Sequence, residues 1–290
     1  MVTDKTFAGK MFDLFNILLL SLIAILMLLP FLHVVMGSFT TAEEMARKPF
    51  VLFPTVFTFD SYRYIFSTNT LFKAMGVSIG VTVVGTLISM ILTSMMAYGL
   101  TRRDLDGRKT MNLMIVFTML FHGGLIPSFL IVKNLGLIDT YMSLILPGAI
   151  SAFNLIILRS FFQGLPDGVE ESAKIDGCGD FGILFRIVLP LSMPALATIS
   201  LFYAVNYWNS YFGAIMFMND ADKWPIQVLL RQIVIAASGM AADTSNEFVK
   251  PPEQTIKMAV IVVSTLPILI VYPFLQKYFA KGALVGSVKG

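Results

Sequence analysis

The sequence has few of the side chains that metal and redox sites use. Charged residues make up only 13% of its 290 positions, and it contains one cysteine, Cys178, and two histidines, His33 and His122. A single cysteine excludes an intrachain disulfide, and so few His and Cys side chains do not form a closed zinc site. We therefore expect no metal, cofactor or redox chemistry in this chain.

Signatures of nucleotide hydrolysis and of nucleic-acid binding are also missing. No G-x-x-x-x-G-K-[ST] phosphate loop occurs in the sequence, so the chain is not expected to hydrolyse ATP by the common P-loop design. The net charge is +3 and the basic residues are scattered, whereas nucleic-acid binding needs a gathered basic surface. The sequence predicts neither an enzyme nor a nucleic-acid-binding protein.

Hydrophobic residues are abundant instead. They make up 56% of the chain, and the mean hydropathy is +0.78, which indicates a protein surrounded by lipid. Runs without Asp or Glu are long enough for the roughly 20 residues of a membrane helix. Six spans are predicted in one transmembrane domain over 1–290, at about 14–36, 74–101, 110–132, 140–160, 187–218 and 258–276. A cleaved signal peptide is the competing interpretation of the first run, but its apolar core would be shorter.

Lys and Arg beside the span ends indicate the orientation. They gather in the N-terminal segment, at 102–109, at 159–186 and in the C-terminal segment, which places both termini in the cytoplasm by the positive-inside rule. The loops at 37–72, 133–139 and 219–257 also carry Lys and Arg, but charge in long segments has less influence on topology. The charges therefore predict a multi-pass membrane protein with both termini in the cytoplasm.

The polar segment 165–190, between predicted spans four and five, carries strong local signals. Asp167 after Pro166 is a natural N-cap, Glu170 completes a capping box, and Gly177 ends a short helix that runs through Ile175. The polar face of this helix is expected to meet water or a partner, through Glu170, Glu171 and Lys174. The apolar face is expected to pack against the membrane domain, through Val169, Ala173 and Ile175.

The same segment resembles the EAA loop of binding-protein-dependent ABC importer permeases. Glu171, Ser172 and Ala173 are followed after three residues by Gly177, and after nine more by Ile187, Val188, Leu189 and Pro190. Ser172 replaces the alanine more common in the family. The resemblance implies a type I importer permease fold with a cytoplasmic coupling helix that contacts a separate ATPase through Glu170, Glu171, Ser172, Ala173, Asp176, Gly177, Ile187, Leu189 and Pro190.

Further stretches are similar to the oligosaccharide branch, in particular to the lipoprotein-type or complex-polysaccharide permeases of Gram-positive bacteria. They start at Leu120, Leu146, Leu201 and Tyr272. The resemblance implies a homologous second permease, two ATPase subunits that bind ATP and magnesium, an extracellular solute-binding lipoprotein and an oligosaccharide substrate. It also implies that the C-terminal tail reaches the ATPase, through Gln276, Lys277, Lys289 and Gly290.

Amide and aromatic side chains in predicted span five suit a sugar path, because they satisfy the hydroxyls and cover the ring faces of a saccharide. Asn206, Tyr207, Asn209 and Ser210 are the candidates there. His122 in span three stands beside Gly123, Gly124 and Pro127, which predict a kinked or unwound helix and a hinge or gate. The competing interpretation for all of these side chains is hydrogen bonding between helices.

Three other functions stay open on the sequence alone. An importer of the same type for a non-sugar solute would share the coupling motif. A gradient-driven carrier or a channel is disfavoured, because no Asp or Glu lies inside the six apolar runs and such carriers place carboxylates at membrane depth. The third is a regulatory membrane scaffold.

Overall fold

The computed structural model describes residues 6–48, 50–67, 69–102, 104–237 and 254–287, and all the regular structure in these ranges is helical, as predicted. The chain divides into two compact units. Unit 1 comprises Met1–Asn69 and Leu230–Leu266, and unit 2 comprises Thr70–Leu229 and Pro267–Gly290. Helices α14 (Ile226–Ala237) and α15 (Gln254–Ser287) each contribute residues to both units.

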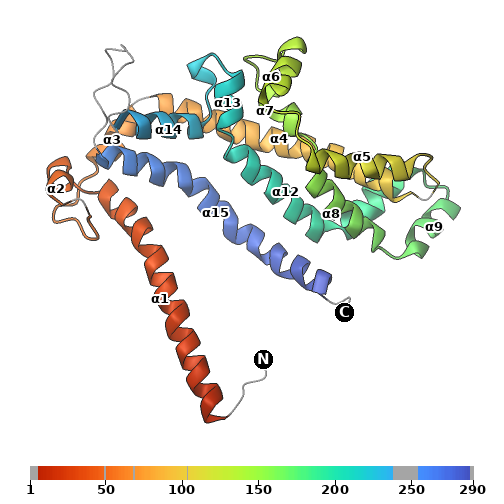
Figure 1. Ribbon diagram of the computed structural model, residues 1–290, viewed down its shortest axis with the longest axis horizontal. Coiled ribbons are helices and arrows are strands. Elements are labelled where there is room, and N and C mark those ends of the chain that lie inside the picture. Colours follow the sequence, from red (N-terminus) through yellow and green to blue (C-terminus); the bar gives the residue numbers. More distant parts are fainter. Residues whose placement is uncertain (1–5, 49, 68, 103, 238–253, 288–290) are drawn as a thin grey trace. The chain divides into compact units, whose positions relative to one another are not determined.

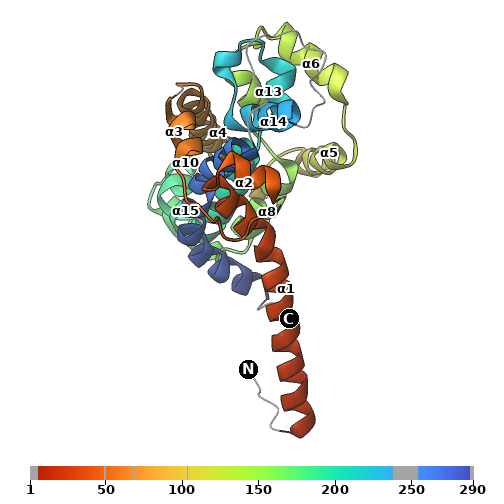
Figure 2. The same cartoon turned by 90° about the vertical axis from the view of Figure 1, so that its left-hand side faces the viewer.

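Unit 1 begins with the long apolar helix α1 (Phe7–Ser38), followed by α2 (Ala42–Arg47) and α3 (Asp60–Ser67). The 32 residues of α1 extend about 48 Å, more than the roughly 30 Å of a hydrocarbon core. Gly37 allows the end of α1 to approach Met45 of α2 and Met258 of α15, because a Cβ there would overlap both methionine side chains. Figures 1 and 2 show α2 at this end of α1.

Glu44 fixes the loop that connects α2 to α3. Its carboxylate accepts hydrogen bonds from the hydroxyl of Thr55 (2.6 Å), from the amide of Thr55 (3.0 Å) and from the ammonium group of Lys48 (3.2 Å). Its side chain is only 10% exposed. The hydrogen bond from the Thr55 hydroxyl, aided by the Thr55 amide and Lys48, lowers the pKa of Glu44 to about 2.

We expect acid to release this loop. The carboxylate has a lower pKa in the folded chain than its ordinary value of 4.5, so its contribution is present above pH 4.5 and is lost as the pH falls from 4.5 toward about 2. The protection factor of the Thr55 amide in hydrogen exchange, in which the intrinsic pH dependence of exchange is divided out, checks this when it is measured against pH. Glu44→Gln should remove the pH dependence, whereas Glu43→Gln, at an exposed position of the same helix, should keep it; equal curves for the two variants would contradict the assignment.

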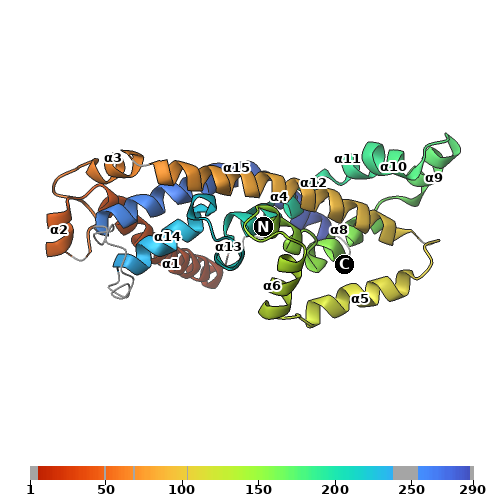
Figure 3. The ribbon, with the colours of Figure 1, turned by 90° about the horizontal axis from the view of Figure 1, so that it is seen from above.

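Unit 2 is built on the long helix α4 (Asn69–Thr101), which belongs to this unit from Thr70 onward. Its core contains the fully buried side chains of Leu158, Ile183 and Ile199. Figure 3 shows α5 and α10 on opposite sides of the last turns of α4. The other helices of the unit are α5 (Arg108–Leu120), α6 (Leu125–Asn134), α7 (Met142–Ile145), α8 (Ala152–Gln163), α9 (Asp167–Ile175), α10 (Asp180–Ile183), α11 (Leu189–Leu191), α12 (Met193–Trp208) and α13 (Phe212–Phe217). Short irregular helices lie at Leu146–Gly148, Leu184–Val188 and Ala221–Lys223.

Three of the expected spans are broken helix pairs. Arg108–Leu120 and Leu125–Asn134 meet at 118°, Met142–Gly148 and Ala152–Gln163 at 54°, and Asp180–Leu191 and Met193–Trp208 at 88°. Three single helices are also long and apolar enough to cross a membrane, so the described residues provide three spans, or up to six when each pair is one span. The break after α5 agrees with the kink expected from Gly124, whose φ is +88°.

The predicted span 187–218 differs most from the structure. A π-helical turn at Leu184–Val188 precedes Pro190, and α12 ends at Trp208, so Asn209 and Ser210 lie in a break before α13. Pro190 lacks an N–H donor and its ring clashes with the preceding turn, which accounts for the irregular start. The apolar run therefore forms several short helices rather than one continuous helix.

Candidate functional site

Helix α9, in the EAA-like segment, begins one residue earlier than the sequence predicts. Pro166 occupies the cap position, and Asp167 is the first helical residue, so the predicted capping box between Asp167 and Glu170 is wrong. Proline suits this position because it has no N–H to leave unsatisfied. Glu170 is thereby free to bind elsewhere.

The end of α9 is a Schellman motif centred on Gly177. The amide of Gly177 donates to the carbonyl of Lys174 (3.0 Å), and the amide of Cys178 donates to the carbonyl of Ala173 (2.9 Å). This motif needs a residue in the left-handed conformation after the helix, and Gly177 has φ +79°. The predicted role of Gly177 as the helix terminator is confirmed.

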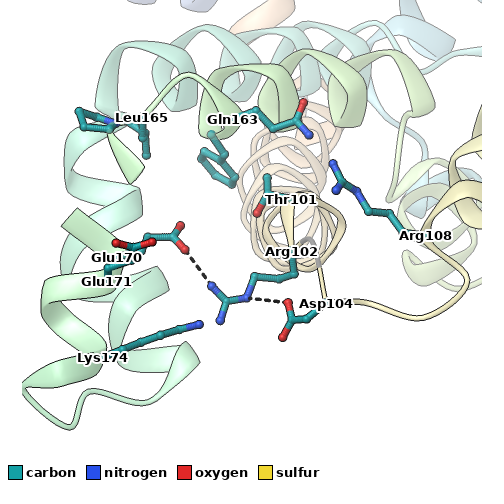
Figure 4. A pocket seen from close by; sticks show the side chains of 11 residues that line it. Thr101, Arg102, Asp104, Arg108, Gln163, Leu165, Glu170, Glu171 and Lys174 are labelled. Atoms are coloured by element: carbon teal, nitrogen blue, oxygen red, sulfur yellow. Dashed lines mark hydrogen bonds and ion pairs between the residues drawn. The ribbon is translucent and has the colours of Figure 1, made fainter. Parts of the chain in front are cut away.

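Arg102, at the end of α4, joins α9 to the body of unit 2. Its Nη1 donates to Glu170 Oε2 of α9 at 2.8 Å, and its Nη2 donates to Asp180 Oδ1 of α10 at 2.5 Å. The guanidinium also lies 5.4 Å from the centre of the Tyr98 ring, within the range of a cation–π contact. Figure 4 shows Arg102 pointing toward Glu170, with Asp104 on its other side. The Arg102 side chain is 14% exposed.

A cavity of about 460 Å³ opens beside these ion pairs, between the end of α4 and α9. Three basic and three acidic side chains line it, so its walls carry no strong net charge. Its lining residues are Thr101, Arg102, Asp104, Arg108, Phe162, Gln163, Leu165, Pro166, Glu170, Glu171 and Lys174.

The EAA-like residues divide between a buried and an exposed face. Ala173 is buried, as predicted. Ile187 and Leu189, which the resemblance assigns to the ATPase contact, are half-buried and pack against the core. Ile175, expected to pack inward, is instead 87% exposed. The motif residues that are exposed are Glu171, Ser172, Asp176, Gly177 and Pro190.

Two tyrosines of α12 hold unit 2 together. The Tyr207 hydroxyl donates to the carbonyl of Ile145 (3.1 Å) and shares a hydrogen bond with Ser89 of α4 (2.8 Å). The Tyr203 hydroxyl bonds to Thr93 of α4 (2.7 Å) and accepts from the amide of Ser151 (2.9 Å), which satisfies a backbone donor at the break before α8.

The candidate path residues do not share one environment. Tyr207 is 3% exposed, so its hydroxyl serves helix packing in this structure and does not line an open path. Asn206 and Asn209 are exposed, Ser210 is half-buried, and Asn209 Nδ2 donates to the carbonyl of Val205 at 2.9 Å. His122 is exposed in the break between α5 and α6.

The tail residues expected to contact the ATPase lie partly or wholly outside the described structure. Gln276 and Lys277 belong to α15, but their side chains lie outside the described part of the structure, as do Lys289 and Gly290 altogether. Among the described residues, no group of three or more His, Cys, Asp or Glu side chains is placed to hold a metal ion.

Sequence reasoning missed a polar cluster at Asp139. The Asp139 carboxylate accepts from the amides of Asn219 (3.2 Å) and Asp220 (3.1 Å) and from Lys223 Nζ (2.7 Å). The hydrogen bond from Lys223 is the main reason why the pKa of Asp139 is lowered. Asp139 has φ +61°, uncommon for a residue other than glycine. These partners are separated from Asp139 by 80 to 84 positions, and such a pairing cannot be read from a single sequence.

Comparison with known proteins identifies the family. The profile of the binding-protein-dependent transport system inner membrane component family matches residues 107–285. The chain is 62% identical over 284 residues to the polygalacturonan/rhamnogalacturonan transport system permease protein YtcP of Bacillus subtilis (strain 168), covering 97% of this chain and 99% of that protein. It is 54% identical over 288 residues to protein LplC of the same strain, covering 99% and 97%.

A solved structure is also similar. A chain in the crystal structure of a bacterial ABC transporter involved in the import of the acidic polysaccharide alginate superimposes with a TM-score of 0.86. It is 31% identical and covers 95% of this chain and 99% of that chain. These likenesses confirm the predicted type I importer permease fold and the location in a membrane. The chain belongs to the family of binding-protein-dependent transport system inner membrane components.

Proposed function

We propose that this chain is one of two membrane subunits of an ATP-driven importer that takes up oligosaccharides. The observation that carries the proposal is α9: a short helix closed at Gly177 and tied to α4 through Arg102, with Glu171 and Ile175 exposed in the EAA-like motif. A helix fixed at its base and exposed on its outer face suits the transmission of force from a docked protein. We assign that protein to a separate ATPase.

The proposal includes the assembly around the chain. A homologous second permease, two ATPase subunits that bind ATP and magnesium, and an extracellular solute-binding protein complete the importer, and membrane lipid surrounds it. The chain forms a single transmembrane domain over 1–290, and both termini and α9 face the cytoplasm, in agreement with the positions of Lys and Arg. The tail residues Gln276, Lys277, Lys289 and Gly290 contact the ATPase.

For the substrate, we infer an oligosaccharide that contains uronic acids. YtcP is named for polygalacturonan and rhamnogalacturonan transport, and the similar solved transporter imports the acidic polysaccharide alginate. We place the path beside the accessible polar side chains of Asn206, Asn209, Ser210 and His122. Tyr207 does not line the path but supports α12 through its hydrogen bonds with Ser89 and Ile145. Amide and hydroxyl groups at these positions would satisfy the sugar hydroxyls.

Purification of the tagged chain from its host membrane tests the assembly. We expect a second permease and an ATPase to accompany it, and we expect the reconstituted complex with its binding protein to hydrolyse ATP faster with oligogalacturonides than with neutral malto-oligosaccharides. Asn206→Ala and Asn209→Ala should lower this stimulation without loss of subunits. A chain that purifies alone would favour a carrier or channel, and stimulation only by a non-sugar solute would overturn the substrate class.

A further inference from the structure

Three helical elements meet at one guanidinium in unit 2. Arg102 directly follows α4, Glu170 lies in the middle of α9, and Asp180 begins α10, the first helix of the bent pair Asp180–Leu191 and Met193–Trp208. Each carboxylate binds a different nitrogen of Arg102, at 2.8 and 2.5 Å. The Arg102 side chain therefore joins the end of α4 to the proposed coupling helix α9 and to α10.

We propose that Arg102 is a positioning residue that transmits the displacement of α9 to α4 and to α10. This inference rests on the proposed function, because it assigns a role to Arg102 in the same site. The planar guanidinium presents donors in a fixed fork, so two carboxylates bound to separate nitrogens keep a defined spacing. A rigid link of this kind moves its three elements together.

The burial of Arg102 distinguishes this contact from an ordinary surface ion pair. Exposed ion pairs contribute little, because water competes for both charges. Arg102 is 14% exposed and Glu170 is 29% exposed, whereas Asp180 is 64% exposed. The link to α9 is therefore the stronger of the two, and the link to α10 is the one that solvent weakens.

Loss of the guanidinium would have a second consequence. Glu170 and Asp180 both bind the same guanidinium, and Asp104 lies 4.0 Å from its Nε. Without the guanidinium, these negative charges would face one another with no positive charge between them. Like charges at short distance repel, and α9 and α10 would separate. A neutral substitution at Arg102 therefore removes a link and also introduces repulsion, and an experiment must separate these effects.

The test uses the complete transporter in proteoliposomes with its solute-binding protein, and measures oligogalacturonide uptake per ATP hydrolysed. We expect Arg102→Gln to keep its ATPase subunits yet to lower this ratio about tenfold, the scale on which single residues change coupling between sites. Arg102→Lys should be intermediate, since one ammonium group does not reproduce the fork. Arg108→Gln is the matched control, because Arg108 lines the same cavity but takes no part in the contacts with Glu170 and Asp180.

A triple variant separates the loss of the link from the repulsion between carboxylates. In the triple substitution Arg102→Gln, Glu170→Gln and Asp180→Asn no carboxylates face each other, so the complex should assemble even if Arg102→Gln alone does not. We expect its coupling ratio to stay low. A wild-type ratio in Arg102→Gln or in the triple variant would overturn the inference while leaving the importer intact. If the wild type itself neither retains an ATPase nor takes up sugar, the proposed function fails instead.

Discussion

Replacing Gly177 with valine is expected to abolish most of the uptake while leaving the protein in the membrane. Gly177 has φ +79°, a conformation that costs a residue with a Cβ about 1–2 kcal/mol, with more for a β-branched side chain. A cost of about 2 kcal/mol would lower the ratio of native to altered ends of α9 roughly thirtyfold. The exposed residues that directly precede Gly177, Ile175 and Asp176, would lose their positions.

Two companion variants make the test specific to backbone conformation. Asparagine tolerates the left-handed region better than other residues, so Gly177→Asn should retain more uptake than Gly177→Val. Gly179 has an extended backbone (φ −74°, ψ 164°), and a Cβ added there meets nothing within 4 Å, so Gly179→Val should behave nearly as wild type. Uptake and ATPase retention are the measurements. Equal damage from Gly177→Val and Gly179→Val would refute the conformational argument.

The short-range features of this fold could be predicted from the sequence because their causes are local. The apolar runs gave the membrane helices, and Gly177 gave the end of α9, since a glycine after a short polar helix favours a left-handed terminus. Gly124 likewise marked the break between α5 and α6. These predictions needed only the preferences of neighbouring residues.

The long-range contacts could not be predicted. Glu170 was expected to complete a capping box three residues from Asp167, but in the structure it pairs with Arg102, 68 positions earlier. Both patterns are compatible with the sequence, and only the folded arrangement decides between them. Ile175 was expected to face inward from its apolar character, yet it is exposed. Hydrophobicity alone does not separate a core position from a docking surface.

The path candidates show the same limit. A tyrosine and amides in one apolar helix are compatible both with a sugar path and with bonds between helices. Tyr207 turned out to make such bonds, to Ser89 and Ile145, whereas Asn206 on the same helix is exposed. The sequence shows that polar groups exist in the span, but their rotational position depends on the break at 209–211 and on the neighbours of α12.

The Tyr207 contacts lead to the second large effect, at Gly85 of α4. A Cβ built on Gly85 would lie 2.9 Å from Cε2 of Tyr207 and 3.0 Å from Cδ2 and Cζ, which is too close for carbon atoms. The ring does not swing away freely, because its hydroxyl is bound to both Ser89 and Ile145. We therefore expect Gly85→Ala to destabilise the protein by about 1–3 kcal/mol, the usual cost of overpacking. The thermal unfolding midpoint of the purified chain in detergent measures this.

Gly80→Ala is the matched control, since its added Cβ meets nothing within 4 Å in the same helix, and glycine in a helix is less stable than alanine by roughly 0.5–1 kcal/mol. The control should therefore be neutral or stabilising.

Tyr207→Phe should also destabilise the protein, because it leaves the buried Ser89 hydroxyl and the Ile145 carbonyl without the Tyr207 hydroxyl as a partner. Gly85→Ala displaces the ring from these same partners, so the double variant should lose less stability than the two single losses added. Strict additivity of the two losses would show that Gly85→Ala acts on something other than Tyr207. The role that we assign to Tyr207, the support of α12 beside the path, would then be wrong.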